Sequence, residues 1–169
     1  MKYCSKCGNQ VNDDAVVCVQ CGCKIENFGN NGGLVAPVGQ LKTNRGVIKF
    51  ILLSIITFGI YGLVVMSSVS TDINIIAGRY DGKKTMHYCL VVFIFAGLTL
   101  GIVPLVWYHK ISNRIGGELR RRGITYPFGA GSFWGWNILG AFIVVGPIIY
   151  MHKMLKAMNL LSENYNING

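Results

Sequence analysis

Residues 47–66 read VIKFILLSIITFGIYGLVVM, a long apolar run with a glycine-containing break near its end. Two further runs follow the same plan, YCLVVFIFAGLTLGIVPLVWYHK at 88–110 and SFWGWNILGAFIVVGPIIYMHK at 132–153. In a helix, about 20 apolar residues match the roughly 30 Å hydrocarbon core of a bilayer. The three runs therefore predict helices embedded in a membrane.

The composition favours this interpretation over its alternative, three core helices of a soluble protein. Of 169 residues, 51% are hydrophobic and only 14% are charged, which leaves too little polar sequence to cover three such helices. The net charge is +9, and the basic residues flank the apolar runs. Anionic lipid headgroups are the partner that this placement favours. A nucleic-acid partner is not favoured, because the basic residues form no separate patch.

The three runs begin an internal repeat. A shift of 42 residues aligns Ile73 with Ile115, and a further shift of 43 aligns Ile115 with Met158. The expected repeats cover about 46–82, 86–123 and 131–165, within a domain of residues 45–169. Each has an apolar helix, a joint and an amphipathic helix, whose apolar residues recur at spacings of three and four. The joints contain Gly59 and Gly62, Gly101 and Pro104, and Gly146 and Pro147.

The joints allow two topologies. In the first, each repeat spans the bilayer as one kinked helix, and the charge distribution weakly favours a cytoplasmic N-terminus. In the second, each joint is a tight turn and the repeat is a re-entrant hairpin, with Pro104 and Pro147 at the start of a new helix. We expect three spans, because the full runs have the right length, and keep hairpins as the alternative.

Residues 1–23 contain two pairs of cysteines, Cys4 with Cys7 and Cys18 with Cys21, separated by ten residues. Two such CxxC pairs supply four thiolates for a tetrahedral Zn²⁺ site with no open position, so the zinc is expected to be structural. A disulfide framework is the disfavoured alternative, because no cleavable signal peptide precedes the cysteines. Cys23 is expected to be a bystander thiol. Residues 24–44 are rich in Gly and Asn and predict a flexible linker.

Two parts of the chain resemble known families. The opening MKYCSKCG with the later CVQCG is similar to the zinc-ribbon module of many bacterial membrane proteins. The stretch LLSIITFGIYGLVV resembles the bacterial domain-of-unknown-function family 4234, which has an apolar helix, a TFGIYG-type break and an amphipathic continuation. The resemblance implies a location in the bacterial cytoplasmic membrane with the ribbon in the cytoplasm. It implies no activity.

The amphipathic extensions carry the remaining candidate residues. His109 and His152 are aligned and are expected to be interfacial anchors, with a pH-sensitive pair or metal ligands as the alternative. Gly97 and Gly101 have the spacing of a helix-dimerisation motif, which makes a homo-oligomer an option. The candidate lipid or interface residues are Trp107, Tyr108, His109, Lys110, Arg120, Arg121, Arg122, Tyr150, His152 and Lys153.

No enzyme motif is recognisable, and the seven acidic residues are scattered. The sequence therefore predicts a non-enzymatic protein with an all-α membrane domain of three repeated broken helices and a small N-terminal zinc ribbon. The ribbon is expected to be an interaction or sensing module that binds a protein partner. The alternative is a small oligomeric channel or transporter built from the broken helices.

Overall fold

The computed structural model describes residues 2–3, 10–11, 37 and 39–169, and the chain divides into two compact units, 1–35 and 36–169. In the first unit, strand β1 (Lys2–Tyr3) pairs antiparallel with β2 (Gln10–Val11), with Lys2 opposite Val11. The five cysteines of the predicted ribbon, Cys4, Cys7, Cys18, Cys21 and Cys23, lie outside the described residues.

The second unit consists of three helical hairpins, each with a short arm and a long arm. Hairpin 1 is α1 (Val47–Ile56) and α2 (Ile60–Asp81). In hairpin 2, the short arm runs through α3 (Tyr88–Leu90), the π-helix η1 (Val91–Phe95) and α4 (Ala96–Leu98), and the long arm is α5 (Ile102–Arg121). In hairpin 3, the short arm runs through α6 (Ala130–Ser132), the π-helix η2 (Phe133–Ile138) and the 3-10 helix η3 (Leu139–Ile143), and the long arm is α7 (Gly146–Asn168).

The chain reverses at a tight turn in each hairpin, which we call the tip. Gly59 and Gly101 adopt positive φ angles of 90° and 86°, a conformation that glycine takes without steric cost. The preceding Phe58 and Leu100 also have positive φ, 50° and 48°, and Val144 has 63° in the third tip. The three-span prediction, in which a kinked helix continues through each joint, is therefore wrong for these residues. The joints are turns, as the alternative proposed.

Close packing of small residues accompanies two of the turns. A Cβ atom on Gly62 would lie 3.1 Å from Ser54 Oγ of the facing arm. In hairpin 3, Gly140 and Gly146 meet so closely that a side chain on either would overlap the backbone of the other. Pro147 lies in the first turn of α7, where its missing N–H costs nothing. The joint residues of the sequence therefore act by allowing reversal and close approach of the arms.

The long arms pack on one another to form the core. Helices α2, α5 and α7 are in mutual contact, and their apolar faces bury Ile73, Ile115 and Met158 completely. The sequence alignment pairs these three positions. Spacings of three and four residues along each arm place the other core residues on the same face, so the long arms specify the fold.

Each long arm also holds the segment that leads into another hairpin. The side-chain amide of Asn74 on α2 accepts a hydrogen bond from the N–H of Thr85 (2.7 Å) and donates one to its carbonyl (2.9 Å). Asn159 on α7 makes the same pair of bonds to the backbone of Arg45, both at 3.0 Å. Gly116 on α5 lies against the backbone of Phe128 so closely that a Cβ would overlap it. Thus α2 contacts the segment that leads into hairpin 2, α5 the segment that leads into hairpin 3, and α7 the segment that leads into hairpin 1. The three hairpins are therefore connected by a closed cycle of contacts.

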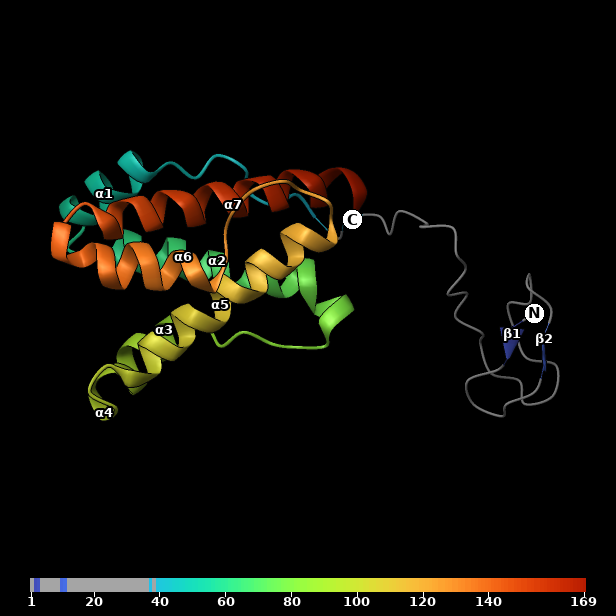
Figure 1. The fold of residues 1–169 in the computed structure, drawn as a ribbon, viewed down its shortest axis with the longest axis horizontal. Coiled ribbons are helices and arrows are strands. Elements are labelled where there is room, and N and C mark those ends of the chain that lie inside the picture. Colours follow the sequence, from blue (N-terminus) through green and yellow to red (C-terminus); the bar gives the residue numbers. More distant parts are fainter. Residues whose placement is uncertain (1, 4–9, 12–36, 38) are drawn as a thin grey trace. The chain divides into compact units, whose positions relative to one another are not determined.

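The three tips lie at the same end of the helical unit (Figure 1). We call this the apolar end, and the opposite end, with the segments 82–87 and 122–129 and the C-terminus, the polar end. Among the described residues, only α2 is long and apolar enough to cross a bilayer, and 44% of its most apolar window is buried. Core helices of soluble proteins reach the same length and composition, so this helix alone is weak support for a membrane association.

Candidate functional site

The apolar end is the most unusual surface of the helical unit. Phe58 is 98% exposed, Leu100 94% and Phe142 88%. Around them lie further exposed apolar side chains of the three tips: Ile55, Ile56, Ile60, Leu98, Ile102, Leu139, Ile143 and Val144. Large exposed apolar surfaces on a protein mark contacts with another protein or a membrane.

No Asp, Glu, Lys or Arg occurs within residues 50–71, 85–109 or 123–152, which contain the three tips and their flanks. The nearest charges towards the polar end include Lys49, Lys110 and Lys153. Lys49 and Lys110 are exposed, and Lys153 is half-buried with its Nζ 5.8 Å from the centre of the Trp136 ring. Basic side chains thus follow directly where the charge-free segments end.

The backbone of the first two tips is hydrogen-bonded internally. The N–H groups of Thr57, Phe58 and Gly59 bond to carbonyls of α1, and that of Ile60 bonds to the carbonyl of Thr57. The Thr57 hydroxyl donates to the Leu53 carbonyl (2.6 Å) and accepts from the Tyr61 N–H (2.9 Å). Thr99 makes the equivalent bonds to Phe95 and Val103 in the second tip. Together these bonds pair the N–H groups of residues 57–61 and 99–103 within the protein.

The aromatic residues predicted to anchor at an interface belong mainly to the core. Trp107 is 5% exposed and donates its indole N–H to the Met86 carbonyl (2.8 Å). Tyr150 is 1% exposed, and its hydroxyl pairs with that of Ser112 (2.8 Å). Tyr108, half-buried, pairs with the Tyr88 hydroxyl (2.8 Å). The prediction is therefore wrong for Trp107 and Tyr150. Trp107 packs against Tyr88 of the short arm of its own hairpin, and Tyr150 packs against Phe133 of its own hairpin and Tyr108 of α5.

The predicted histidine pair is not brought together by any contact in the described region. His109 is half-buried, and its Nδ1 accepts a hydrogen bond from the indole N–H of Trp134 (3.0 Å). His152 is exposed on α7. Among the described residues, no group of three or more His, Cys, Asp or Glu side chains has the arrangement of a metal site.

The three consecutive arginines have different surroundings. Arg120 is exposed. Arg121 and Arg122 both bind the buried carboxylate of Glu118, and Arg122 also reaches the Asn164 side chain (2.7 Å). Burial alone would raise the pKa of Glu118, but the hydrogen bonds and charges of the two arginines outweigh it and hold that pKa below its usual value. Of the three, Arg120 is left for an external anion.

Gly97 and Gly101 do not form a helix-dimerisation face. Gly97 lies in α4, which ends at Leu98, and Gly101 is the left-handed residue of the second tip. Only Gly97 is therefore part of a helix, and the helix-dimerisation motif that suggested an oligomer is absent from the described residues.

A buried ion pair lies directly after the predicted linker. The Arg45 guanidinium binds the Asp72 carboxylate, with only 5% and 11% of the two side chains exposed. Leu41, within the predicted linker 24–44, exchanges two backbone hydrogen bonds with the Asn166 side chain on α7 (2.7 and 2.9 Å). The end of the predicted linker is therefore part of the helical unit.

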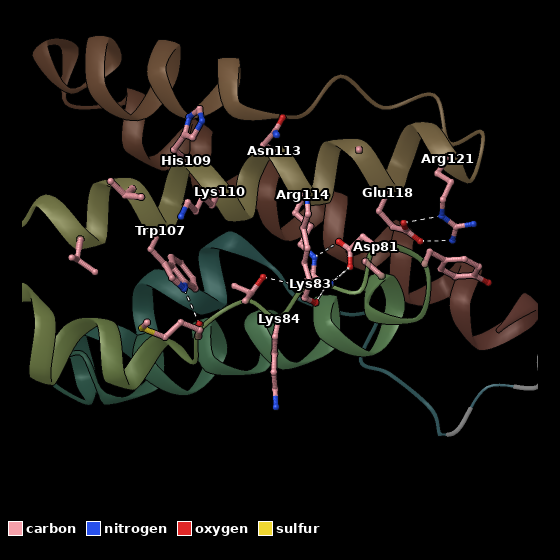
Figure 2. A pocket seen from close by; sticks show the side chains of 17 residues that line it. Asp81, Lys83, Lys84, Trp107, His109, Lys110, Asn113, Arg114, Glu118 and Arg121 are labelled. Atoms are coloured by element: carbon pink, nitrogen blue, oxygen red, sulfur yellow. Dashed lines mark hydrogen bonds and ion pairs between the residues drawn. The ribbon is translucent and has the colours of Figure 1, made fainter. Parts of the chain in front are cut away.

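A groove lies between the end of α2, the segment 82–87 and α5 (Figure 2). Its volume is about 930 Å³, within the range of small-molecule sites. Arg114 fixes one wall, because its guanidinium binds Asp81 (2.7 Å), the Thr85 hydroxyl (2.7 Å) and the Lys83 carbonyl (2.5 Å). Lys83, Lys84 and Lys110 also line it.

Sequence reasoning missed Asn74, Asn159, Arg114 and two lysines of the groove, Lys83 and Lys84. Lys110 was among the predicted interface residues. A signal existed for the asparagines, because the shifts of 42 and 43 residues that align the core also align Asn74 with Asn159. Asn in the interior of a helix has poor propensity, so two aligned occurrences point to a side-chain role. Nothing comparable in the sequence pairs Arg114 with Asp81.

Comparison with family models gives two matches. Residues 45–117 match DUF4234, a domain of unknown function, and residues 3–25 match a zinc-ribbon domain. Both resemblances noted in the sequence are confirmed. No curated protein and no solved structure matches the chain significantly.

The zinc-ribbon match indicates zinc binding. Its residues include the four cysteines Cys4, Cys7, Cys18 and Cys21, whose thiolates are the donor set of a closed tetrahedral site. The described pairing of β1 with β2 brackets the first cysteine pair. The donor set and this short hairpin fit a structural zinc ion.

Proposed function

We propose that the protein is a membrane-inserted adaptor whose three hairpins enter one leaflet from the cytoplasmic face of a bacterial membrane. The zinc ribbon then acts on the same face as an interaction or sensing module, and the protein has no enzymatic activity. The observation that carries this proposal is the gathering of three charge-free tips, with Phe58, Leu100 and Phe142 almost fully exposed, at one end of the helical unit.

The lengths of the short arms fit insertion into one leaflet. Helix α1 has 10 residues, which at about 1.5 Å per residue reach roughly 15 Å. That is about half of the roughly 30 Å hydrocarbon thickness of a bilayer. Residues 88–98 form a short arm of similar length. A hairpin of this depth returns to the side from which it entered.

The backbone of the tips is compatible with hydrocarbon. A reversal of the chain in lipid leaves costly unpaired N–H and C=O groups unless they are bonded internally. In the first two tips the turn bonds and the hydroxyls of Thr57 and Thr99 provide that internal bonding. The exposed turns therefore lose few backbone hydrogen bonds to water when they move into lipid.

The charges beyond the tips support an anionic membrane as the partner. Lys49, Lys110 and Lys153 lie just outside the charge-free segments, where each basic residue near an anionic surface contributes about 1 kcal/mol. Long lysine side chains can keep their ammonium groups at the headgroups while the stems lie along apolar surface.

Cysteine accessibility in cells tests the topology. Single cysteines replace Phe58, Leu100 or Phe142 at the tips, and Arg79, Thr125 or Glu163, which are exposed at the polar end, with Cys89 changed to Ser. The parent without an added cysteine gives the background from the ribbon. A membrane-impermeant maleimide should label none of the six from outside intact cells. In inverted vesicles it should label only the three polar-end positions.

Three other results would contradict the proposal. Labelling of the tips from outside would mean that the hairpins reach the far side, which favours the channel or transporter alternative. Labelling of Arg79→Cys from outside, without Thr125→Cys, would restore three spans. If all six positions label in a soluble fraction, the protein is not a membrane protein.

A further inference from the structure

The groove beside α5 changes character along its length. Val103, Val106 and Trp107 line it towards the tip of hairpin 2, and Lys110 follows one turn further along the helix. Beyond Lys110 its lining from α5 is polar or charged apart from a glycine: Asn113, Arg114, Gly117, Glu118 and Arg121. Since α5 starts at the apolar end, the groove runs from apolar to charged in the same direction.

The charges of the groove leave an excess of cations. Its two carboxylates are occupied, Asp81 by Arg114 and Glu118 by Arg121 and Arg122. Lys83, Lys84 and Lys110 have no ion pair within the described residues. Lys84 extends away from α5, whereas Lys110 lies between Trp107 and Arg114 (Figure 2). Lys110 therefore lies where the apolar wall ends, and Lys83 lines the groove from the segment 82–87.

From this arrangement we propose that the groove binds one phospholipid with an anionic headgroup. Lys83 and Lys110 hold the headgroup phosphate, and one acyl chain lies along Val103, Val106 and Trp107. This inference rests on the proposed function, because it needs the tip of hairpin 2 to lie in the acyl-chain region of the bilayer. Complementarity of both charge and polarity along one groove distinguishes a lipid from a small soluble anion.

The third hairpin offers a matched comparison. Lys153 aligns with Lys110, but its ammonium group lies over the ring of Trp136. Lys156 lies over the ring of Tyr126 in the same way, at 5.5 Å. These two lysines have the same charge and a similar depth along a long arm, without lining the groove. They serve as the control for a general attraction to an anionic surface.

Native mass spectrometry of the full chain released from nanodiscs tests the proposal. The nanodiscs contain phosphatidylcholine with phosphatidylglycerol, and the bound lipids are counted. The wild type should retain one phosphatidylglycerol molecule. Each lysine removed from an anionic contact should weaken retention about fivefold. The variant Lys83→Gln/Lys110→Gln should therefore weaken retention about 25-fold, while Lys153→Gln/Lys156→Gln, which removes the same charge, should keep it.

The outcomes separate this inference from the proposed function. Flotation with vesicles of phosphatidylcholine alone should be equal for all three proteins, since these vesicles offer no anionic headgroups and insertion depends on the tips. Equal retention by the groove variant and the control would overturn the lipid site while leaving insertion intact. Displacement of the lipid by millimolar glycerol phosphate would also overturn it, in favour of a soluble phosphate ester. A wild type that does not float with vesicles would refute the proposed function first.

Discussion

The two ends of the helical unit are built on opposite plans. At the apolar end, large apolar side chains such as Phe58 and Leu100 are exposed. Towards the polar end, Asp72 and Glu118 are buried and bound by arginines. The hydrogen bonds that fix the hairpins to one another lie away from the tips. The comparison teaches that the interactions that specify the fold are separated from the exposed apolar surface that is available to a membrane.

The largest effect is expected at the tips. The variant Phe58→Asp/Leu100→Asp/Phe142→Asp should lose membrane binding, because an Asp in the hydrocarbon core costs roughly 2.5–3.5 kcal/mol. Vesicle flotation measures the bound fraction, which should fall from nearly all to a small remainder. The matched variant with Leu at positions 58 and 142 should bind like the wild type. Unchanged flotation of the triple Asp variant would mean that the exposed tips do not mediate membrane binding.

The buried ion pair towards the polar end should give the next largest effect. Asp72→Ala leaves the Arg45 guanidinium, 5% exposed, without its counter-charge, and breaking a buried pair costs about 3–5 kcal/mol. Thermal unfolding in detergent, followed by circular dichroism, should show the loss. Replacing both partners, Arg45→Met with Asp72→Leu, should recover most of it. A single substitution without effect would mean that segment 41–45 does not stabilise the unit.

Two neighbouring glycines on α5 sharpen the comparison at the level of packing. Gly116→Ala should destabilise the unit by about 1–3 kcal/mol, because the added methyl group overlaps the backbone of Phe128. Gly117 has open space around it. Gly117→Ala should therefore be neutral or stabilise by about 0.5–1 kcal/mol, as expected for alanine in a helix. The same unfolding measurement decides, and equal effects would contradict the observed contact.

Acidification should give the smallest effect. The pKa of Glu118 is lower in the folded protein than the usual glutamate value of 4.5. The ionised carboxylate therefore stabilises the fold above that usual value, and the stabilisation is lost as the pH falls through the lowered pKa. The loss should be on the order of 1 kcal/mol, since Arg121 is 39% exposed and partly screened by water. Melting temperatures between pH 7 and pH 3 should fall less in Glu118→Gln than in the wild type. Parallel curves would assign the acid sensitivity to other carboxylates.

The sequence predicted the positions of the three joints, but it did not decide whether the chain reverses at them. The shifts of 42 and 43 residues located all three joints, and Gly59 and Gly101 take the left-handed conformation there. Run length alone favoured three spans, because the count of apolar residues is the same for one long helix and for two arms. What decides between them is the local φ of Phe58 and Leu100, which no residue preference predicts for a bulky side chain.

The candidate site was predictable in part for the same reason. The charge-free tips and the lysines that follow them are local patterns, so each can be recognised within a single segment of the sequence. The burial of Trp107 and Tyr150 depends on which helix covers which face, and the groove depends on Arg114 meeting Asp81 from another hairpin. Such contacts between distant segments leave no periodic signal in a single sequence.

The bonds between Leu41 and Asn166 join residues 125 positions apart. During synthesis, α7 leaves the ribosome after the other described helices, so hairpin 1 is made long before its leading segment meets its partners on α7. Contacts of such separation form late in folding, because the intervening loop must first be closed. A nascent chain that stops short of α7 lacks the Asn159 and Asn166 bonds to this segment. Synthesis of α7 is thus a condition for securing the first hairpin.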